Sequence, residues 1–370
     1  FGKIAKVQID GMDKFESIGI IVRKGSWESK DIGEDRFITQ IPDDGNVEIW
    51  LRQGDPTIHY SIPTTPVAKN PVLDQIALYD SPEFISKFTY TGNDLGVTYT
   101  KKATTLRVWA PTATAVNVVT YKESNSPYSS GKLTPMKYDV KGTWVATLKG
   151  DQDGTVFNYR VQVNGANNEA VDPYARATTV NGLRGVIVDL STTNPVGWNK
   201  SKPKFSGKPT DAFIYELHVR DLSMDASSGF PAAQKGKYVA FTNTNTTFAG
   251  QKTGIAAIKD LGVTHVELLP IFDFATVDEN NPTFNWGYDP QNYNVPEGSY
   301  SADPTNPKLR IKELKSAVLS LHKQGLRVNM DAVYNHVSNA STFSQNLIVP
   351  NYFFRRDDNG NLTSGSGCGN

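Results

Sequence analysis

Residues 311–336 read IKELKSAVLSLHKQGLRVNMDAVYNH and join a helix pattern to a strand pattern. Apolar side chains step by three, four and three positions, as on one face of a helix: Ile311, Leu314, Val318 and Leu321. This spacing predicts an amphipathic helix that ends at Gly325, followed by a strand over 326–333. A helix that leads directly into a hydrophobic strand is typical of a parallel α/β sheet.

The same alternation precedes this stretch and begins after Asp211. Residues 213–219 and 263–269 are hydrophobic runs that predict two more strands. Apolar residues at every third position of 255–261, with Gly262 at the position of a helix C-cap, predict a helix between them. Strands and helices therefore alternate as in a sheet wound by right-handed crossovers.

The N-terminal residues 1–61 indicate a small β-domain. Short strands separated by turn clusters are expected at 17–23, 36–40 and 47–52. In the last of these strands, Trp50 shares a face with Glu48. Trp50 could be a platform for a sugar or could pack under a neighbouring loop, and Trp27 leaves the same two alternatives open.

A second β-rich region follows residues 62–96, whose prolines indicate a linker with connecting strands. Within residues 97–192, apolar residues alternate with polar ones at Phe157, Tyr159, Val161 and Val163. Further strands are expected at 106–110, 116–121, 143–148 and 185–190. This series predicts a β-sandwich, and a second Pro-rich linker over 193–212 closes it.

The composition excludes several classes of protein. The 38 Lys and Arg residues balance the 38 Asp and Glu residues, which argues against a nucleic-acid binder that works through basic charge. No apolar run approaches the roughly 18 residues of a membrane helix, so we expect no membrane insertion. The single cysteine, Cys368, excludes an internal disulfide framework. The chain begins with Phe1 rather than Met, and we expect it to be part of something longer.

The segment 271–308 is the most informative loop. It connects the second strand to its helix and is rich in aromatic residues: Phe272, Phe274, Phe284, Trp286, Tyr288, Tyr293 and Tyr300. Long loops of compact domains usually bind or catalyse, and this one leaves the carboxyl end of a parallel strand. Aromatic rings among Asn and Asp suit a pyranose, although a lid packed down by its own aromatics remains the alternative.

The third strand ends in Asp331-Ala332-Val333-Tyr334-Asn335-His336. This places Asp331 inside the strand and Asn335 with His336 at its carboxyl end. An Asp at such a position is as often a structural anchor as a catalyst. From the residues alone, His336 is as often a satisfied polar residue as a substrate contact.

Residues 331–336 match the first signature region of the α-amylase superfamily, glycoside hydrolase family 13. Residues 284–290, Phe-Asn-Trp-Gly-Tyr-Asp-Pro, resemble the Tyr-Asn-Trp-Gly-Tyr-Asp-Pro motif of type I pullulanases, with Phe284 in place of the first Tyr. Residues 215–221 resemble the first barrel strand of this group. Segments 95–113 and 172–175 resemble the carbohydrate-binding module of family 48, and residues 1–61 resemble a starch-module-type β-domain more loosely.

The resemblance implies roles for several residues. Tyr288 would stack on the sugar in the −1 subsite, with Trp286 beside it, and His336 would hydrogen-bond that sugar. Asp289 and Asp331 would anchor the site by pairing with an Arg elsewhere. Asn335 would brace the loop, at a position where relatives sometimes ligate a structural calcium. Cys368, in a segment similar to a Gly-Cys-Gly-Asn loop, would line the cleft wall.

The resemblance also implies the fold class: N-terminal β-sandwich modules followed by the first three βα units of a (β/α)8 barrel. Residues 213–370 are too few for eight strands, so the barrel is incomplete in this chain. The catalytic carboxylates of the family follow later strands, and we expect none within residues 1–370. Alone, this chain should hydrolyse nothing.

The implied function is endo-acting, retaining hydrolysis of α-1,6-glucosidic branch links in pullulan, glycogen and starch dextrins. A non-catalytic glycogen- or starch-binding protein, an isoamylase-type debrancher and a branching enzyme are the alternatives. No Gly-rich phosphate-binding motif follows any predicted strand. The five His residues lack zinc-ligand spacing, no cofactor is expected to be required, and a structural calcium is compatible with the family. A polymeric substrate suits an extracellular or cell-surface location.

Overall fold

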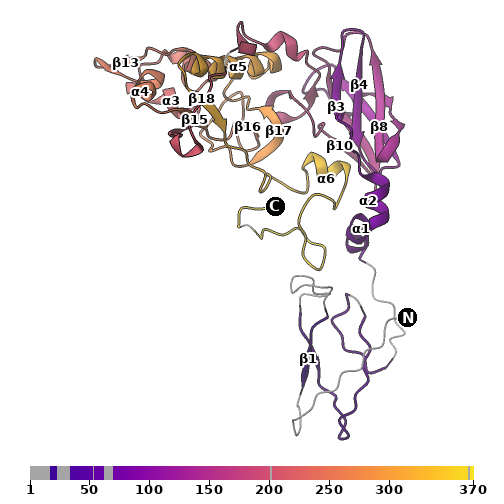
Figure 1. Ribbon diagram of the computed structural model, residues 1–370. Coiled ribbons are helices and arrows are strands. Elements are labelled where there is room, and N and C mark those ends of the chain that lie inside the picture. The colour runs from indigo at the N-terminus through magenta and orange to yellow at the C-terminus, as the bar shows by residue number, and fades with distance from the viewer. Residues whose placement is uncertain (1–16, 23–33, 53, 62–69, 201, 366) are drawn as a thin grey trace. The chain divides into compact units, whose positions relative to one another are not determined.

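The computed structural model describes residues 17–22, 34–52, 54–61, 70–200, 202–365 and 367–370. The chain forms two compact units. One unit comprises residues 1–78 and 356–363, and the other comprises residues 79–355 and 364–370. Figure 1 traces the chain from its N-terminus to its C-terminus. Among the described residues, no helix has the length and apolar character that a membrane crossing needs.

The described part of the N-terminal domain contains one antiparallel strand pair, β1 (Ile18–Ile20) with β2 (Arg36–Ile38). The buried Arg36 side chain donates to the carbonyl of Asp55 at 2.9 Å and thereby holds the following loop. The strand expected at 47–52 is reduced to a single bridge between Trp50 and His59. Trp50 is half-buried there, whereas Trp27 lies outside the described residues.

The expectation that residues 62–96 hold only a linker and connecting strands is wrong. They contain two helices, α1 (Pro71–Tyr79) and α2 (Pro82–Phe88). Each helix begins with proline, a residue that costs nothing at the first helical position because the amide there has no intrahelical acceptor. Ser81 caps α2, since its side-chain oxygen accepts from the Phe84 amide at 3.2 Å. Pro71, one of the prolines that indicated a linker, is a helix start.

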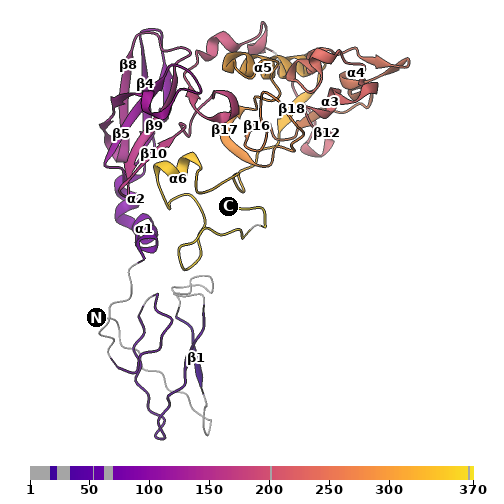
Figure 2. The ribbon, with the colours of Figure 1, turned by 180° about the vertical axis from the view of Figure 1, so that it is seen from behind.

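The second region is a β-sandwich, as the sequence predicts. One sheet has the strand order β10-β9-β5-β6, with β11 also on β9, and the other has the order β3-β4-β8-β7. The strands are β3 (Gly96–Tyr99), β4 (Ala103–Trp109), β5 (Ala115–Tyr121), β6 (Lys132–Pro135), β7 (Lys137–Tyr138), β8 (Thr143–Lys149), β9 (Val156–Val163), β10 (Ala166–Ala170) and β11 (Gly185–Val186). Figures 1 and 2 show the sandwich from opposite sides.

The sandwich core confirms the predicted alternation along β9. Phe157, Tyr159, Val161 and Val163 are all buried between the sheets, together with Leu106 and Val118. The short helix α6 (Ser344–Ile348) lies beside β10 in both ribbon views (Figures 1 and 2). Asn168 of β10 donates to the carbonyl of Leu347 at 2.8 Å, so the chain beyond the barrel strands returns to the sandwich.

The barrel region contains three parallel strands in the order β12 (Ile214–Leu217), β15 (His265–Leu268) and β18 (Arg327–Met330). Its helices are α3 (Asp221–Met224), α4 (Gly254–Asp260) and α5 (Pro307–Lys323). The predicted helix at 311–321 is the middle of α5, which Asn306 caps at its start and Gly325 follows at its end. Core residues such as Val266, Leu268 and Leu321 pack between the sheet and the helices.

The described chain also contains short 3-10 helices, at Tyr128–Ser130, Val140–Gly142, Val180–Gly182, Leu190–Thr193, Trp198–Lys200, Pro209–Asp211, Ala226–Ser228, Ala232–Gln234 and Tyr238–Thr242. The two-residue strands β13 (Thr247–Phe248) and β14 (Gln251–Lys252) pair with each other. The segment 193–212 therefore carries short helical turns within the predicted linker.

Two details of the barrel region differ from expectation. The loop 271–308 is not structureless, since it contains the antiparallel hairpin of β16 (Phe272–Phe274) and β17 (Pro290–Pro296). Asp331 lies one residue beyond β18 rather than inside it, although its amide still donates to the Leu268 carbonyl at 2.9 Å. The hairpin and the end of β18 both depend on which backbone segments pair with each other, and a hydrophobic sequence pattern does not reveal that pairing.

Candidate sugar-binding site

The β16–β17 hairpin and the end of β18 bring the predicted site residues together. Tyr288 precedes β17 and Asp331 follows β18, yet the Tyr288 hydroxyl donates to Asp331 Oδ2 at 2.7 Å. His336 Nε2 donates to the Tyr288 carbonyl at 2.5 Å. The aromatic ring, the carboxylate and the imidazole thus form one connected group, although they come from segments more than 40 residues apart.

Tyr288 is 40% exposed, so part of this residue is accessible from solvent. Burial of the hydroxyl raises its pKa to about 12, with further contributions from Asp331, Glu216 and Glu267. Glu216 of β12 and Glu267 of β15 stand opposite each other in the parallel register, next to Asn329 of β18. Tyr288 therefore stays a neutral hydrogen-bond donor at physiological pH, beside a row of acidic side chains.

His336 already uses both of its ring nitrogens. Because the Tyr288 carbonyl can only accept, Nε2 carries the proton. Nδ1 is then an acceptor and receives the side-chain amide of Asn335 at 3.2 Å. A sugar hydroxyl would have to share or displace one of these bonds, which the prediction from the sequence did not include.

Within the described residues, the two predicted anchors have partners other than an Arg. Asp289 Oδ2 accepts from the amide of Thr276 at 2.9 Å and from its hydroxyl at 2.5 Å. Asp331 accepts from Tyr288, and neither carboxylate pairs with an Arg within the described residues. The carbonyl of Asn335 accepts from Arg355 at 3.1 Å, which braces the loop at this position.

Trp286 lies beside Phe284 rather than against the Tyr288 ring. The Phe284 and Trp286 rings meet edge to face at 5.2 Å, and Trp286 is 58% exposed. Both contact the buried His218, at 5.0 Å and 6.3 Å between ring centres. His218 Nε2 also donates to the Asn285 carbonyl at 2.8 Å, so this buried histidine fixes the backbone of the 284–290 motif. Sequence reasoning missed His218, whose signal was a polar residue just after the first strand.

A cavity of about 170 Å³ lies on a different part of the hairpin surface. It is lined by residues that include Arg220, Lys235, Lys237, Phe274, Asn285 and Tyr300. None of the six barrel-region residues predicted for the site lines it. Cys368, predicted to line the cleft wall, is exposed.

Replacing Gly287 with alanine should displace Tyr288 and lower stability. Gly287 has a φ of +89°, and a Cβ there would lie 2.7 Å from the Pro270 carbonyl oxygen. Backbone strain of this kind costs about 1–3 kcal/mol. We expect Gly287→Ala to lower the free energy of unfolding by more than this strain alone, because the collision with Pro270 adds to it, as measured by urea denaturation.

Gly262→Ala is the matched control for this substitution. Gly262 also has a positive φ, +74°, but an added Cβ would have no neighbour within 4 Å. The difference between the two variants isolates the collision with Pro270. Equal losses in both would show that the Gly287 backbone has room for a side chain.

Three families match parts of the chain. Residues 1–60 match the bacterial pullulanase-associated domain, residues 94–175 match carbohydrate-binding module 48 (isoamylase N-terminal domain), and residues 239–361 match the α-amylase catalytic domain. A pullulanase of Bacillus subtilis is 42% identical over 297 residues, which cover 80% of this chain and 40% of that protein. Over most of its length the chain is therefore similar to part of a pullulanase, and its matching domains are those of the pullulanase group of glycoside hydrolase family 13. It spans less than half the length of this relative.

Solved pullulanase structures have the same fold. A Paenibacillus barengoltzii pullulanase in complex with maltohexaose and α-cyclodextrin matches with a TM-score of 0.75 and 47% identity, covering 78% of this chain and 45% of that one. The Bacillus acidopullulyticus pullulanase covers 95% of this chain and 48% of its own, with a TM-score of 0.74 and 37% identity. The predicted succession of a β-sandwich and the start of a barrel, recognised as pullulanase-like, is thereby confirmed.

Proposed function

We propose that these residues are the N-terminal portion of a debranching enzyme that hydrolyses α-1,6-glucosidic links in pullulan, glycogen and starch dextrins. The observation that carries this proposal is the convergence of Tyr288, Asp331 and His336 at the carboxyl end of the parallel strands. An exposed ring beside a carboxylate and an imidazole suits a pyranose, whose C–H face stacks while its hydroxyls hydrogen-bond. The pullulanase relatives support an α-glucan as the ligand.

The proposed mechanism retains the anomeric configuration and needs two carboxylates about 5–5.5 Å apart. We assign these carboxylates to segments beyond residue 370. Two features support the assignment: only three barrel strands are present among the described residues, and apolar side chains at the start of the first strand are exposed. Phe213 is 71% exposed and Ile214 is 51% exposed, as expected for a strand whose other neighbour is elsewhere.

Within this proposal the residues of the present chain bind and orient the substrate. Tyr288 supplies the stacking surface of the −1 subsite, and Asp289 and Asp331 fix the hairpin and the ring. No cofactor is required in this scheme, a structural calcium remains compatible with it, and the location proposed is extracellular or at the cell surface.

An assay on pullulan tests the proposal with two proteins, residues 1–370 alone and the longer product of the same gene. We expect new reducing ends and maltotriose from the longer protein and none from residues 1–370. Turnover by residues 1–370 would refute the assignment of the carboxylates. Products from α-1,4 cleavage, or transfer without new reducing ends, would refute the debranching hydrolase in favour of another family-13 reaction.

A further inference from the structure

A turn of the sandwich lies directly on the hairpin that carries Tyr288. The carbonyls of Asn181 and Gly182 accept from the side-chain amides of Gln291 and Asn292, both at 3.0 Å. Gly182 has a φ of +64°, and a Cβ there would lie 2.3 Å from Asp273 Oδ2. Only glycine permits this approach, so the turn and the hairpin are shaped for close contact.

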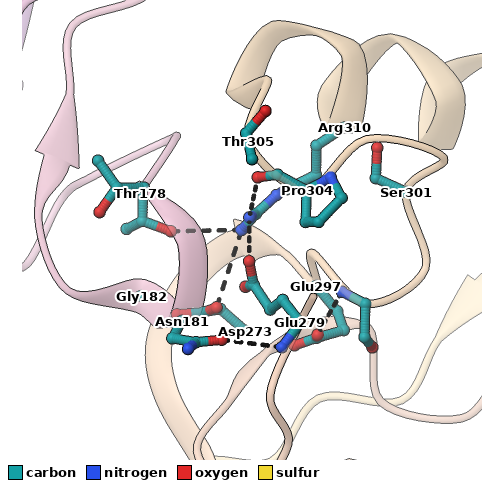
Figure 3. Close-up of polar contacts among 12 residues, drawn as sticks. Thr178, Asn181, Gly182, Asp273, Glu279, Glu297, Ser301, Pro304, Thr305 and Arg310 are labelled. Atoms are coloured by element: carbon teal, nitrogen blue, oxygen red, sulfur yellow. Dashed lines mark hydrogen bonds and ion pairs between the residues drawn. The ribbon is translucent and has the colours of Figure 1, made fainter. Parts of the chain in front are cut away.

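Arg310 of α5 fastens this contact from the other side (Figure 3). Its guanidinium is fully buried, donates to Glu279 Oε2 at 2.6 Å and to Thr178 Oγ1 at 3.4 Å, and lies 3.8 Å from Asp273 Oδ1. The Arg310 side chain therefore links α5 to Asp273 and Glu279 of the hairpin region and to Thr178 of the sandwich turn. Asn181 adds a further bond, because its side-chain oxygen accepts from the Glu279 amide at 2.8 Å.

The carboxylates of Asp273, Glu279 and Glu297 lie within 4.8 Å of one another, as metal ligands would. The Arg310 guanidinium already lies beside them and supplies positive charge, with a hydrogen bond to Glu279 and an ion pair at 3.8 Å with Asp273. A divalent ion would have to displace it. The geometry therefore assigns this group to an ion-pair cluster and not to a metal site.

The cluster is connected to the candidate sugar site through the backbone of the hairpin. Asp273 Oδ2 accepts from Asn292 at 2.6 Å, which ties β16 to β17. Two residues further along, the Ala275 amide donates to the Asp289 carbonyl at 3.1 Å, and Thr276 holds the Asp289 carboxylate. Tyr288 directly precedes Asp289 in the chain. A shift of Asp273 would pass to Tyr288 through a few short bonds.

We propose that Asn181 and Arg310 are positioning residues for Tyr288 and Asp289, so that the sandwich turn 178–182 is a working part of the sugar site. In this proposal the sandwich helps to fix the positions of Tyr288 and Asp289 in the barrel region, in addition to any sugar binding on its own surface. The claim about Tyr288 rests on the function proposed above, whereas the coupling between turn and hairpin does not.

The test compares Asn181→Gly with Asn164→Gly in the full-length gene product. Asn181 has a φ of +58° and Asn164 has a φ of +51°, so glycine suits both backbones. Asn164 lies in the turn between β9 and β10, which contributes no residue to the cluster. Only Asn181→Gly removes the bond to the Glu279 amide. Hydrogen exchange over residues 272–300 reads the coupling, and kcat and KM on pullulan read the positioning.

We expect exchange at the hairpin amides to rise about fivefold in Asn181→Gly, the factor that corresponds to one lost hydrogen bond, and to stay unchanged in Asn164→Gly. The kcat of Asn181→Gly should fall more than its KM changes, because a misplaced Tyr288 affects alignment. Equal exchange in the two variants would overturn the coupling, and faster exchange with unaltered kcat would overturn the positioning role. If the wild-type protein hydrolyses no α-glucan, the proposed function fails while the exchange result still judges the coupling.

Discussion

Replacing Arg310 with methionine is expected to lower the free energy of unfolding by about 3–5 kcal/mol, because it leaves buried carboxylates without their cation. The guanidinium is fully buried and also donates to the carbonyls of Pro296 and Pro304, at 3.3 Å and 3.1 Å. Methionine fills much of the same volume but satisfies none of these acceptors. Urea denaturation of the variant and the wild type measures the loss.

The double variant Arg310→Met with Glu279→Met provides the sharper comparison. Glu279 is 2% exposed and is the closest carboxylate to the guanidinium, at 2.6 Å. Removing both partners leaves an apolar pair, so the double variant should be more stable than Arg310→Met alone. Lys312→Met, at an exposed position of the same helix, controls for the methionine and should leave stability nearly unchanged. A loss below about 1 kcal/mol in Arg310→Met, or no recovery in the double variant, would contradict the ion-pair assignment.

The main elements could be predicted from the sequence because their patterns are local. The alternation along β9 depends on one face buried in the sandwich core and is borne out. The three-four-three spacing correctly predicts the helix α5, although Leu314 and Leu321 pack in the barrel core while Ile311 packs in a separate cluster with Val186 and Val188. The two helices α1 and α2 were missed because proline indicates both a linker and a helix start. Capping at Ser81 decides between the two, and a hydroxyl at that position was a signal available in the sequence.

The site was predictable as a set of residues but not as a set of contacts. The resemblance to family 13 implied that Tyr288, Asp331 and His336 belong to one site, and the structure brings them together. No spacing indicated that Thr276 holds Asp289 or that His218 holds Asn285. The cluster around Arg310 was less accessible still, since its members range from Thr178 to Arg310 and meet only when the sandwich contacts the barrel region.

Glu297 should make this protein less stable as the pH rises from about 4.5 to about 7. Burial raises the pKa of its carboxyl from 4.5 to about 7, and repulsion from Glu279 adds to the effect. Between these two pH values the folded protein keeps a proton on Glu297 that the unfolded chain has released. The contribution is therefore complete below pH 4.5 and is lost as the pH passes through 7, a difference of about 3 kcal/mol. Asp273 and Lys237 also interact electrostatically with this carboxyl, and burial raises the pKa of Asp273 too.

Glu297→Gln isolates this contribution because it cannot titrate. The carboxylate accepts from the amides of Ser299 and Phe274, at 2.7 Å and 3.0 Å, whereas glutamine offers only one oxygen. The variant should be less stable overall, so the informative quantity is the slope of unfolding free energy against pH, from urea denaturation between pH 4.5 and 7. Asp172→Asn is a control from the sandwich, since burial also raises the pKa of Asp172 to about 7 and the two changes should add. If Glu297→Gln keeps the wild-type slope, Glu297 is ionised in the folded protein, and the Arg310 cluster must then hold more negative charge than one guanidinium balances.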